Sequence, residues 1–451
     1  MQFLAQDAHN RIALSVEEHH LSFAELEAAI YKMTVQLNKL PPGILVLEAT
    51  PQPLFVIQLL AALTIGKPVA LFAHQELTWE KRAILSTNMT VNEHGELLEF
   101  HENNDMKPHP QLALVLFTSG STGQMKAVQL SLKNITANCK AVVKALEFSK
   151  IKDQLLFLPL SYSFGLLGQL LPGLIAGIKT QLLQQFTDIK VLLEGGKVPQ
   201  MWSGVPSHWV AIHKMAALFP ESAAKIKAVV SAGAPLSVSL RESLIHTFSK
   251  AIIYNNYGLT EASPRVLTYS STDPLFLEEY AGYPIGDWQV RLSENNELLI
   301  KGSQLMLGYL GEEQQTRIQD EWFFTGDLAE QLPSGLLAIK GRVDHMVNIG
   351  GEKINLIEIE HKICQLKGIK EVIVLPLNDE LYGIRLLVCL EQSSFSPNIS
   401  EHMLVEQLKQ HLLPRKLPIS VQLLEKLPRN QHGKLDRKTL LLSQKDKIHA
   451  H

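Results

Sequence analysis

Residues 115–126, VLFTSGSTGQMK, constrain the fold and function of this chain more than any other stretch. Apolar residues, which predict a buried strand, run directly into a loop of glycine and hydroxyl residues closed by Lys126. Gly120 and Gly123 allow backbone conformations that turn successive N–H groups toward one anion. The hydroxyl donors of the loop are Thr118, Ser119, Ser121 and Thr122. The pattern predicts a strand followed by a loop that binds a triphosphate, and a polar surface turn is the alternative.

The segment is not a Walker loop. That motif needs two glycines separated by four residues and a Ser or Thr after the lysine. Here Gly120 and Gly123 are closer together, and Ala127 follows the lysine. The phosphate-binding hypothesis therefore depends on support from other motifs.

Length and composition favour a globular chain of two or more domains. A chain of 451 residues exceeds what one hydrophobic core usually serves. Hydrophobic residues make up 46% and charged residues 19%, and the net charge of −3 without a basic run argues against nucleic-acid binding. The three cysteines lie far apart without a C-x-x-C pair, so neither a disulfide framework nor a zinc site is expected.

Neither a signal peptide nor a membrane span is expected. The N-terminus lacks the basic start and apolar core of a secretory signal. Residues 54–73 are long and apolar, but Lys67 and Pro68 interrupt them, which favours a buried helix leading into a strand. We therefore expect a cytoplasmic location.

The apolar pattern alternates between helices and strands. Ser22 and Glu25 have the form of a capping box, which predicts the start of a helix. Helices are predicted over residues 54–64 and 78–86, and strands over residues 43–47, 68–72, 113–117, 155–158, 227–231 and 251–254. This rhythm is typical of a layered α/β fold, in which ligands gather where the strands end.

After about Arg342 the pattern changes to a compact α+β section. Strands are predicted over residues 371–375 and 384–390, and helices over residues 358–365 and 401–412. The predicted fold class is therefore α/β, with a large N-terminal domain of layered α/β subdomains and a small α+β C-terminal domain.

Residues 257–261, YGLTE, place three chemically distinct side chains at the end of a predicted strand. Tyr257 can stack on a base and Thr260 can donate to a phosphate. Glu261 can hold Mg²⁺, a cation that prefers oxygen ligands shared with phosphates. A loop whose glutamate faces water is the alternative.

Two further segments carry candidate ligand-binding residues. Asp327 and Arg342 suit a ribose diol, because a carboxylate accepts and a guanidinium donates hydrogen bonds; an ordinary turn and ion pair is the alternative. Lys434 follows a glycine in LPRNQHGKLDR, where a solvated surface charge is the alternative.

The order of these motifs resembles that of the adenylate-forming superfamily, which includes acyl-CoA synthetases, luciferases and the adenylation domains of peptide synthetases. The phosphate loop, Tyr-Gly-x-Thr-Glu, Thr-Gly-Asp, Gly-Arg-x-Asp, Gly-Gly-Glu-Lys and Pro-Arg-x-x-x-Gly-Lys occur in the family's order and at similar spacing. The resemblance covers the chain from residue 20 to the end. Gly-Gly-Glu-Lys is more similar to acyl-CoA synthetases than to amino-acid adenylation domains.

The resemblance implies where a nucleotide binds. It implies an N-terminal AMP-binding domain over residues 1–341 and a mobile C-terminal domain over residues 342–451, with Asp344 as the hinge. Asp327 and Arg342 match the ribose-binding pair. The residues implied to surround the adenine are Gly233, Ala234, Pro235, Tyr257 and Gly258.

The implied reaction activates a small carboxylic acid with ATP and Mg²⁺, releasing pyrophosphate, and then transfers the acyl group to the thiol of coenzyme A. Lys434 is implied to offset the repulsion between the carboxylate and the α-phosphate, with Thr260 and Glu261 on the phosphates and Mg²⁺. For the second step the resemblance implies a rotation of the small domain. That rotation presents the thiol-tunnel segment, which contains Gly350, Gly351 and Lys353.

Departures from the family pattern bear on the acid. Ser163 stands where amino-acid-activating relatives carry an aspartate that pairs with the substrate ammonium, so an α-amino acid is disfavoured. Tyr162 stands where many acyl- and aryl-CoA synthetases carry a histidine, and Met125 where many members carry proline. The residues assigned to the acyl pocket are Tyr162, Phe164, Trp209, Gly233 and Gly258, with core packing as the alternative for the aromatic ones.

Three functions remain open. The first is an acyl- or aryl-CoA ligase, with fatty acid metabolism as its expected setting. The second is a stand-alone ligase that loads the same acyl group on the phosphopantetheine of a carrier protein. The third is a non-catalytic nucleotide- or acyl-binding protein that kept the fold.

Overall fold

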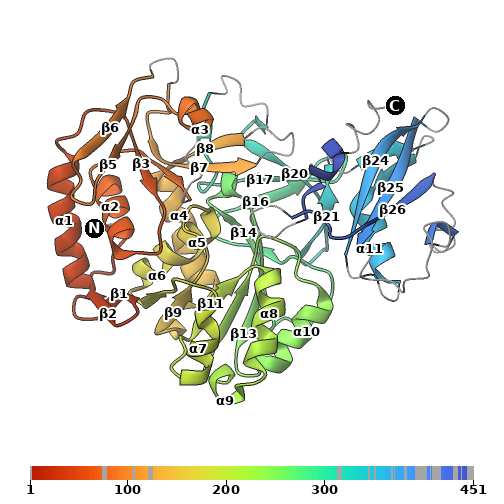
Figure 1. The fold of residues 1–451 in the computed structure, drawn as a ribbon, viewed down its shortest axis with the longest axis horizontal. Coiled ribbons are helices and arrows are strands. Elements are labelled where there is room, and N and C mark those ends of the chain that lie inside the picture. The colour runs from red at the N-terminus through yellow and green to blue at the C-terminus, as the bar shows by residue number, and fades with distance from the viewer. Residues whose placement is uncertain are drawn as a thin grey trace. The chain divides into compact units, whose positions relative to one another are not determined.

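The computed structural model describes residues 3–73, 79–103, 107–119, 125–311, 317–343, 346–349, 352–366, 369, 371–379, 383–391, 404–406, 408, 418–429, 435–437 and 439–443. The chain divides into two compact units. Figure 1 labels the helices and strands and colours the chain by residue number. Unit 1 comprises Met1–Arg291, Leu299–Phe324 and Gln331–Ala338. Unit 2 comprises Leu292–Leu298, Thr325–Glu330 and Ile339–His451.

The first sheet of unit 1 has the strand order β18-β8-β7-β4-β3-β5-β6. Its strands are β3 (Ile44–Glu48), β4 (Val69–Phe72), β5 (Asn88–Val91), β6 (Leu97–His101), β7 (Leu112–Ser119), β8 (Met125–Ser131) and β18 (Gly308–Tyr309). The four strands β5, β3, β4 and β7 run parallel. Strand β8 forms an antiparallel hairpin with β7 and pairs on its other side with β18. The predicted phosphate loop therefore connects the two strands of this hairpin.

The second sheet of unit 1 has the order β15-β14-β13-β12-β11-β9-β10-β1-β2. Its strands are β1 (Ile12–Val16), β2 (His19–Ser22), β9 (Asp153–Leu156), β10 (Lys179–Leu182), β11 (Met201–Gly204), β12 (Ala228–Ser231), β13 (Ile252–Gly258), β14 (Arg265–Ser270) and β15 (Tyr283–Pro284). Strands β1, β10, β9, β11, β12 and β13 run parallel. Their C-terminal ends share one edge, which is where ligands bind in sheets of this kind.

Helices pack on both sheets (Figure 1). They are α1 (Phe23–Leu37), α2 (Pro53–Thr64), α3 (Trp79–Ile84), α4 (Leu132–Ala145), α5 (Ser163–Gly165), α6 (Leu171–Ala176), α7 (Asp188–Gly195), α8 (Pro206–Ala216), α9 (Pro220–Ala223) and α10 (Val238–Thr247), with the short turns η1 (Phe148–Lys150), η2 (Leu166–Leu170) and η3 (Thr260–Ala262). Helix α4 contacts β7 and β8 of the first sheet and β14 of the second. It therefore connects the phosphate-loop hairpin to the neighbourhood of the Tyr257–Glu261 segment.

A five-stranded sheet has the order β16-β17-β20-β19, with β21 also pairing with β20. Its strands are β16 (Gln289–Leu292), β17 (Glu297–Lys301), β19 (Ile318–Gln319), β20 (Trp322–Gln331) and β21 (Leu337–Arg342). Parts of β17, β20 and β21 belong to unit 2.

The C-terminal part of unit 2 contains a hairpin and a three-stranded sheet. The elements are β22 (Met346–Ile349), β23 (Glu352–Asn355), α11 (Leu356–Cys364), β24 (Val372–Asp379), β25 (Gly383–Glu391) and β26 (Ile419–Leu424). Alternate residues of β24 and β25 contribute to two separate cores, one of which includes α11. This α+β section matches the predicted class.

Most predicted elements are present with shifted ends. Ser22 and Glu25 form the predicted capping box, with the Ser22 hydroxyl accepting from the Glu25 N–H at 3.2 Å. Strand β13 extends through Gly258, whereas the prediction ended it at residue 254. The β5–β6 hairpin was not predicted, and most of the helix predicted over residues 401–412 lies outside the described residues. Within the described chain, no helix has the length and apolar character needed to span a bilayer.

Candidate nucleotide and acid site

The β7–β8 hairpin fixes both ends of the predicted phosphate loop. Thr118 pairs with Lys126 and Ser119 with Met125, so these residues belong to the strands and not to the loop itself. Gly120, Ser121, Thr122 and Gly123 lie outside the described residues. The hairpin register therefore places Thr118 and Lys126 opposite each other at the base of the loop.

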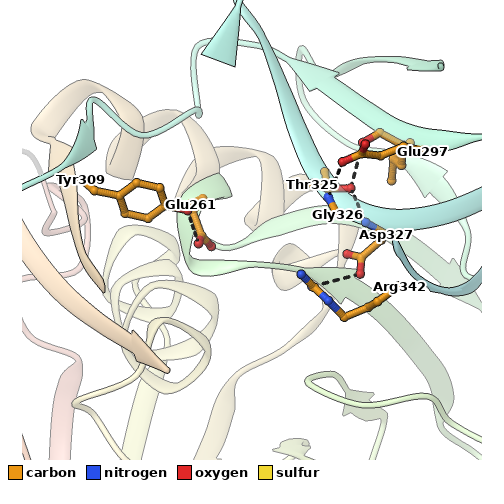
Figure 2. A network of polar contacts seen from close by, with 8 residues as sticks. Glu261, Glu297, Tyr309, Thr325, Gly326, Asp327 and Arg342 are labelled. Atoms are coloured by element: carbon orange, nitrogen blue, oxygen red, sulfur yellow. Dashed lines mark hydrogen bonds and ion pairs between the residues drawn. The ribbon is translucent and has the colours of Figure 1, made fainter. Parts of the chain in front are cut away.

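Lys126, Tyr309 and Glu261 form a connected line of side chains. Nζ of Lys126 lies 4.2 Å from the centroid of the Tyr309 ring. The Tyr309 hydroxyl donates to Oε1 of Glu261 at 2.8 Å (Figure 2). Tyr309 is positioned by β18, where it pairs with Val128 of β8. The phosphate-loop hairpin and the predicted Mg²⁺ ligand are thus linked through a tyrosine that sequence reasoning missed.

The backbone of Glu261 is also held in place. Its carbonyl accepts from the Met306 N–H at 2.8 Å, and it lies in the 3₁₀ turn η3. Next to it, the hydroxyl of Thr260 lies 3.0 Å from that of Ser163. Ser163, which stands where the resemblance implies an aspartate in amino-acid-activating relatives, thus hydrogen-bonds a predicted phosphate ligand.

The ends of β12 and β13 bring the predicted adenine-binding residues to one edge of the sheet. The two strands are parallel, with Ser231 opposite Asn255, so residues that follow Ser231 lie beside the end of β13. The Asn256 side chain donates to the Ser231 carbonyl at 3.2 Å. The residues at this edge are Gly233, which has a φ of +86°, Ala234, Pro235 and Tyr257.

Gly258 is required by the backbone. A Cβ at this position would lie 2.0 Å from the carbonyl oxygen of Pro264. Glycine is therefore needed so that two backbone segments can approach each other, and its assignment to the acyl pocket stays a prediction. The close approach turns the chain from β13 through Thr260 and Glu261 into β14.

Trp209 was predicted to line the acyl pocket, but it lies in the core. Its side chain is fully buried, packs edge-on against Phe248, and donates from Nε1 to the Gly204 carbonyl at 3.1 Å. Trp202 and Ile212 belong to the same core cluster. We therefore assign Trp209 to packing between β11, α8 and α10.

Asn138 of α4 is a second residue that sequence reasoning missed. Its side chain is fully buried and hydrogen-bonds the carbonyls of Ala262 and Arg265, the N–H of Arg265 and Oε1 of Gln304, over distances of 2.7–3.2 Å. These bonds hold the chain that follows Glu261. No sequence signal distinguished this asparagine from other polar residues on a helix.

The predicted ribose-binding pair lies in unit 2. Nη1 of Arg342 lies 3.2 Å from Oδ1 of Asp327 (Figure 2). The Asp327 N–H donates to the Thr325 hydroxyl at 3.1 Å, and the Gly326 N–H donates to Glu297 Oε1 at 2.8 Å. The Thr-Gly-Asp segment of β20 is therefore held by Glu297 of β17, and Arg342 of β21 brings its guanidinium to the Asp327 carboxylate.

Several predicted functional residues lie outside the described part of the chain. They are Asp344, Gly350, Gly351 and Lys434. Lys353 belongs to β23 and pairs with Asn348, and its side chain is likewise outside the described atoms. The hinge, the thiol tunnel and the catalytic lysine therefore stay predictions.

The donor set around Glu261 fits a metal ion shared with phosphates. Among the described residues, no hydrogen bond is made to its second oxygen, Oε2, which leaves one carboxylate oxygen for a cation. The described chain holds no group of three or more His, Cys, Asp or Glu residues suited to a metal. This arrangement suits Mg²⁺, which is commonly held by one or two carboxylates together with substrate phosphates.

The β7–β8 hairpin that bears the predicted phosphate loop, the held carboxylate of Glu261 and the Asp327–Arg342 pair are the features that the motifs predict for a nucleotide-dependent ligase. The profile of a family described as AMP-binding enzyme matches residues 48–310. The 2-succinylbenzoate–CoA ligase of Staphylococcus epidermidis is 30% identical over 338 residues, which cover 72% of this chain and 69% of that protein. The chain belongs to the AMP-binding enzyme family.

Other relatives and solved structures agree with this assignment. The D-alanine–D-alanyl carrier protein ligase of Staphylococcus epidermidis is 28% identical over 345 residues, 72% of this chain and 70% of that protein. ATP-bound MatB from Rhodopseudomonas palustris superimposes with a TM-score of 0.83 at 20% identity, covering 98% of this chain and 97% of MatB.

The o-succinylbenzoate CoA synthetase of Bacillus subtilis, solved with its acyl-adenylate intermediate, gives a TM-score of 0.79 at 23% identity, covering 96% of this chain and 95% of that one. The predicted family and α/β fold class are confirmed, and the chain is an enzyme of the AMP-forming ligase type.

Proposed function

We propose that this enzyme activates a carboxylic acid as an acyl-adenylate at a site built around Lys126, Thr260 and Glu261, and then transfers the acyl group to a thiol. The observation that supports this best is the line from Lys126 through Tyr309 to Glu261. It joins a cation at the base of the phosphate-loop hairpin to a carboxylate with one oxygen left for Mg²⁺.

In the first step, a carboxylate oxygen of the acid attacks the α-phosphorus of ATP. The bond from that phosphorus to the bridging oxygen breaks, and pyrophosphate leaves with the electron pair. Because both reactants are anions, the site must supply positive charge and hydrogen-bond donors. We assign Lys126 and the Thr260 hydroxyl to the phosphates, and Mg²⁺ bound at Glu261 supplies further neutralisation.

We propose that the remaining nucleotide contacts come from two further groups of residues. Asp327 and Arg342 hold the ribose, since Nη1 of Arg342 already lies 3.2 Å from Oδ1 of Asp327 between the neighbouring strands β21 and β20. The adenine lies between Tyr257 and the Gly233–Pro235 segment, which two parallel strands deliver to one edge. Thr118 and Ser119, with the loop that follows them, wrap the phosphates.

The second step is an attack by a thiol on the acyl carbon. The carbon–oxygen bond to phosphate breaks and AMP leaves. We propose that residues 342–451 rotate about Asp344 between the two steps, removing Lys434 and bringing Gly350, Gly351 and Lys353 to the thiol. These assignments rest on the resemblance of the motifs to the family.

Coenzyme A is the proposed acceptor, and a carrier-protein phosphopantetheine is the alternative. Both kinds of acceptor occur among the relatives, since one is named a CoA ligase and another a carrier protein ligase. We also propose a cytoplasmic location, where ATP and coenzyme A are found. Fatty acid metabolism gains no support from relatives named for succinylbenzoate and D-alanine.

An α-amino acid is a poor candidate for the acid. At the position where amino-acid-activating relatives carry aspartate, Ser163 offers a neutral hydroxyl that bonds Thr260 at 3.0 Å. A buried substrate ammonium without a carboxylate partner would be strongly disfavoured. We therefore expect an acid without an α-amino group.

Carboxylate-dependent ATP–pyrophosphate exchange, measured over a panel of acids, tests the proposed function. Exchange with at least one acid is expected. If no acid supports exchange, the enzyme assignment is replaced by the non-catalytic binding role. Thioester formation with coenzyme A, compared with a holo carrier protein, then identifies the acceptor.

A further inference from the structure

Arg265 is a buried cation whose side chain makes no hydrogen bond to any residue that the structure describes. The residue begins β14 and is only 2% exposed. Among the described residues, nothing accepts a hydrogen bond from Nε, Nη1 or Nη2, and each of these atoms is shielded from solvent. Its backbone, in contrast, is fully used, because Asn138 bonds its N–H and carbonyl and Trp288 also donates to its carbonyl at 2.8 Å.

Arg241 shows how this fold satisfies a buried arginine that only supports structure. It is 4% exposed. Its guanidinium donates four hydrogen bonds of 2.7–3.0 Å to backbone carbonyls, those of Leu236, Phe276, Glu278 and Tyr280. The contrast matters because a buried charge without hydrogen bonds is costly and is rarely kept without a reason.

The charge of Arg265 persists at neutral pH. Burial lowers the pKa of its guanidinium to about 9, which still leaves it protonated. The guanidinium carbon lies 5.1 Å from the centroid of the Phe164 ring, a cation–π contact that offsets part of the cost. This contact satisfies none of the five N–H donors of the side chain.

The residues next to the Arg265 guanidinium belong to the same segment as Ser163, which contacts the proposed reaction site. A Cβ on Gly168 would lie 3.2 Å from Nη2 of Arg265 and 3.1 Å from the Phe164 ring, so the guanidinium is close to both residues. Both belong to the segment that starts at Ser163, which hydrogen-bonds Thr260. Residues 166–170 of this segment form a π-helical turn, a rare conformation often found at functional sites.

We propose that the acid substrate carries a second anionic group, in the simplest case a second carboxylate, which binds the Arg265 guanidinium while the first carboxylate reacts beside Thr260. This inference rests on the proposed function. Phe164 is partly exposed and covers the guanidinium, so rotation of its ring admits the anion. A planar guanidinium can then bind the carboxylate through two parallel hydrogen bonds.

The test compares acids of equal chain length that differ only in the second carboxylate. Pyrophosphate exchange is measured for succinate against butanoate, glutarate against pentanoate, and adipate against hexanoate. The wild-type enzyme is expected to favour the best diacid over its matched monoacid by about 10- to 100-fold in kcat/KM, the range for a hydrogen bond to a charged group. Arg265→Gln should reduce that ratio by the same factor, mainly through a higher KM for the diacid.

Two controls separate substrate binding from folding. Arg291→Gln removes an exposed arginine that lies 4.2 Å from the Trp322 ring, and should leave the diacid-to-monoacid ratio as in the wild type. Arg265→Lys keeps the charge but loses the planar fork, and should give an intermediate ratio. Thermal unfolding with and without the preferred diacid gives a second readout, since the diacid should stabilise the wild type and not Arg265→Gln.

The inference is overturned if monoacids match or exceed diacids in the wild type, or if Arg265→Gln lowers exchange equally for both members of a pair. In either case the proposed adenylation activity still stands. If no acid of any kind supports exchange, the proposed function fails and this inference fails with it.

Discussion

The hydroxyl of Tyr309 donates a hydrogen bond to Oε1 of Glu261 at 2.8 Å, while its ring lies beneath the ammonium of Lys126. One side chain thus orients both a predicted metal ligand and a predicted phosphate ligand. The bond occupies Oε1, so Oε2 is the oxygen that we predict to bind the cation.

Tyr309→Phe should weaken use of Mg²⁺ while keeping the ring contact with Lys126. Losing a hydrogen bond to a carboxylate is expected to lower kcat/KM by about 10-fold or more, with a higher Mg²⁺ concentration needed for half-maximal exchange. Pyrophosphate exchange measured across a Mg²⁺ titration checks this. Tyr31→Phe, at a residue that is 69% exposed, is the control, and a wild-type Mg²⁺ dependence in Tyr309→Phe would contradict the role of the bond.

Local patterns predicted the parts of this site that are local in the chain. The apolar run before Thr118 and the glycine-rich residues after it indicated a strand and its loop, and β7 and β8 flank that loop. The capping box at Ser22 was predicted for the same reason, since all its atoms come from four consecutive residues.

Contacts between distant segments could not be predicted from sequence. Tyr309 reaches Glu261 across 48 residues because the two-residue strand β18 pairs with β8, and such a short strand has no pattern of its own. A charged residue such as Arg265 is expected at the surface, so its burial gave no signal. Nothing in the sequence around Gly258 indicates that the Pro264 carbonyl lies close to it.

Gly258→Ala should disrupt the turn that carries Thr260 and Glu261. The added methyl would lie 2.0 Å from the Pro264 carbonyl oxygen, so β13 or β14 must move. We expect a loss of about 2 kcal/mol in the free energy of unfolding and a fall of about 100-fold in exchange activity, because small displacements of reacting groups are costly. Urea unfolding and pyrophosphate exchange measure the two effects.

The matched control for this substitution is Gly195→Ala at the end of α7. A methyl there meets no atom within 4 Å, so stability and activity should stay close to wild type. Equal losses of stability and activity in Gly258→Ala and Gly195→Ala would show that the close approach of Pro264 does not cause them.

Asn138→Ala should destabilise unit 1 without touching substrate. The substitution leaves the buried N–H of Arg265 and the carbonyl of Ala262 without the Asn138 side chain, while Trp288 still donates to the Arg265 carbonyl. We expect a loss of about 3 kcal/mol in the free energy of unfolding, measured by urea denaturation. Lys140→Ala, at an exposed residue of the same helix, should change the free energy little; a similar loss at both positions would indicate a helix effect instead.

His208 should make stability depend on pH. Burial lowers the pKa of its imidazole below the ordinary value of 6.5, and its ring lies 5.4 Å from that of Phe157 and 5.1 Å from that of Phe186. The folded state therefore favours neutral histidine, so this contribution to stability is present above pH 6.5 and is lost as the pH falls from there through the folded-state pKa.

His208→Gln should flatten the decline in unfolding free energy between pH 7.5 and pH 5 relative to the wild type, by urea unfolding at intervals of pH. His246→Gln, at an exposed histidine of α10, should keep the wild-type decline. Identical pH profiles for wild type and His208→Gln would show that the ring cluster tolerates the charged imidazole.

Lys434→Ala should separate the two half-reactions. Lys434 lies outside the described residues, and its role follows from the resemblance of the Pro-Arg-x-x-x-Gly-Lys motif to the family. An ammonium that serves only the meeting of two anions is needed for adenylation and not for attack of a thiol on a neutral acyl carbon. Pyrophosphate exchange should therefore be abolished, while thioester formation from pre-made acyl-adenylate continues near the wild-type rate.

The control is Lys426→Ala, at an exposed lysine eight residues earlier in the chain, which should retain both reactions. Loss of both half-reactions in Lys434→Ala would mean that the lysine supports the fold or the thiol step, and the assignment of a single-step role would have to be abandoned.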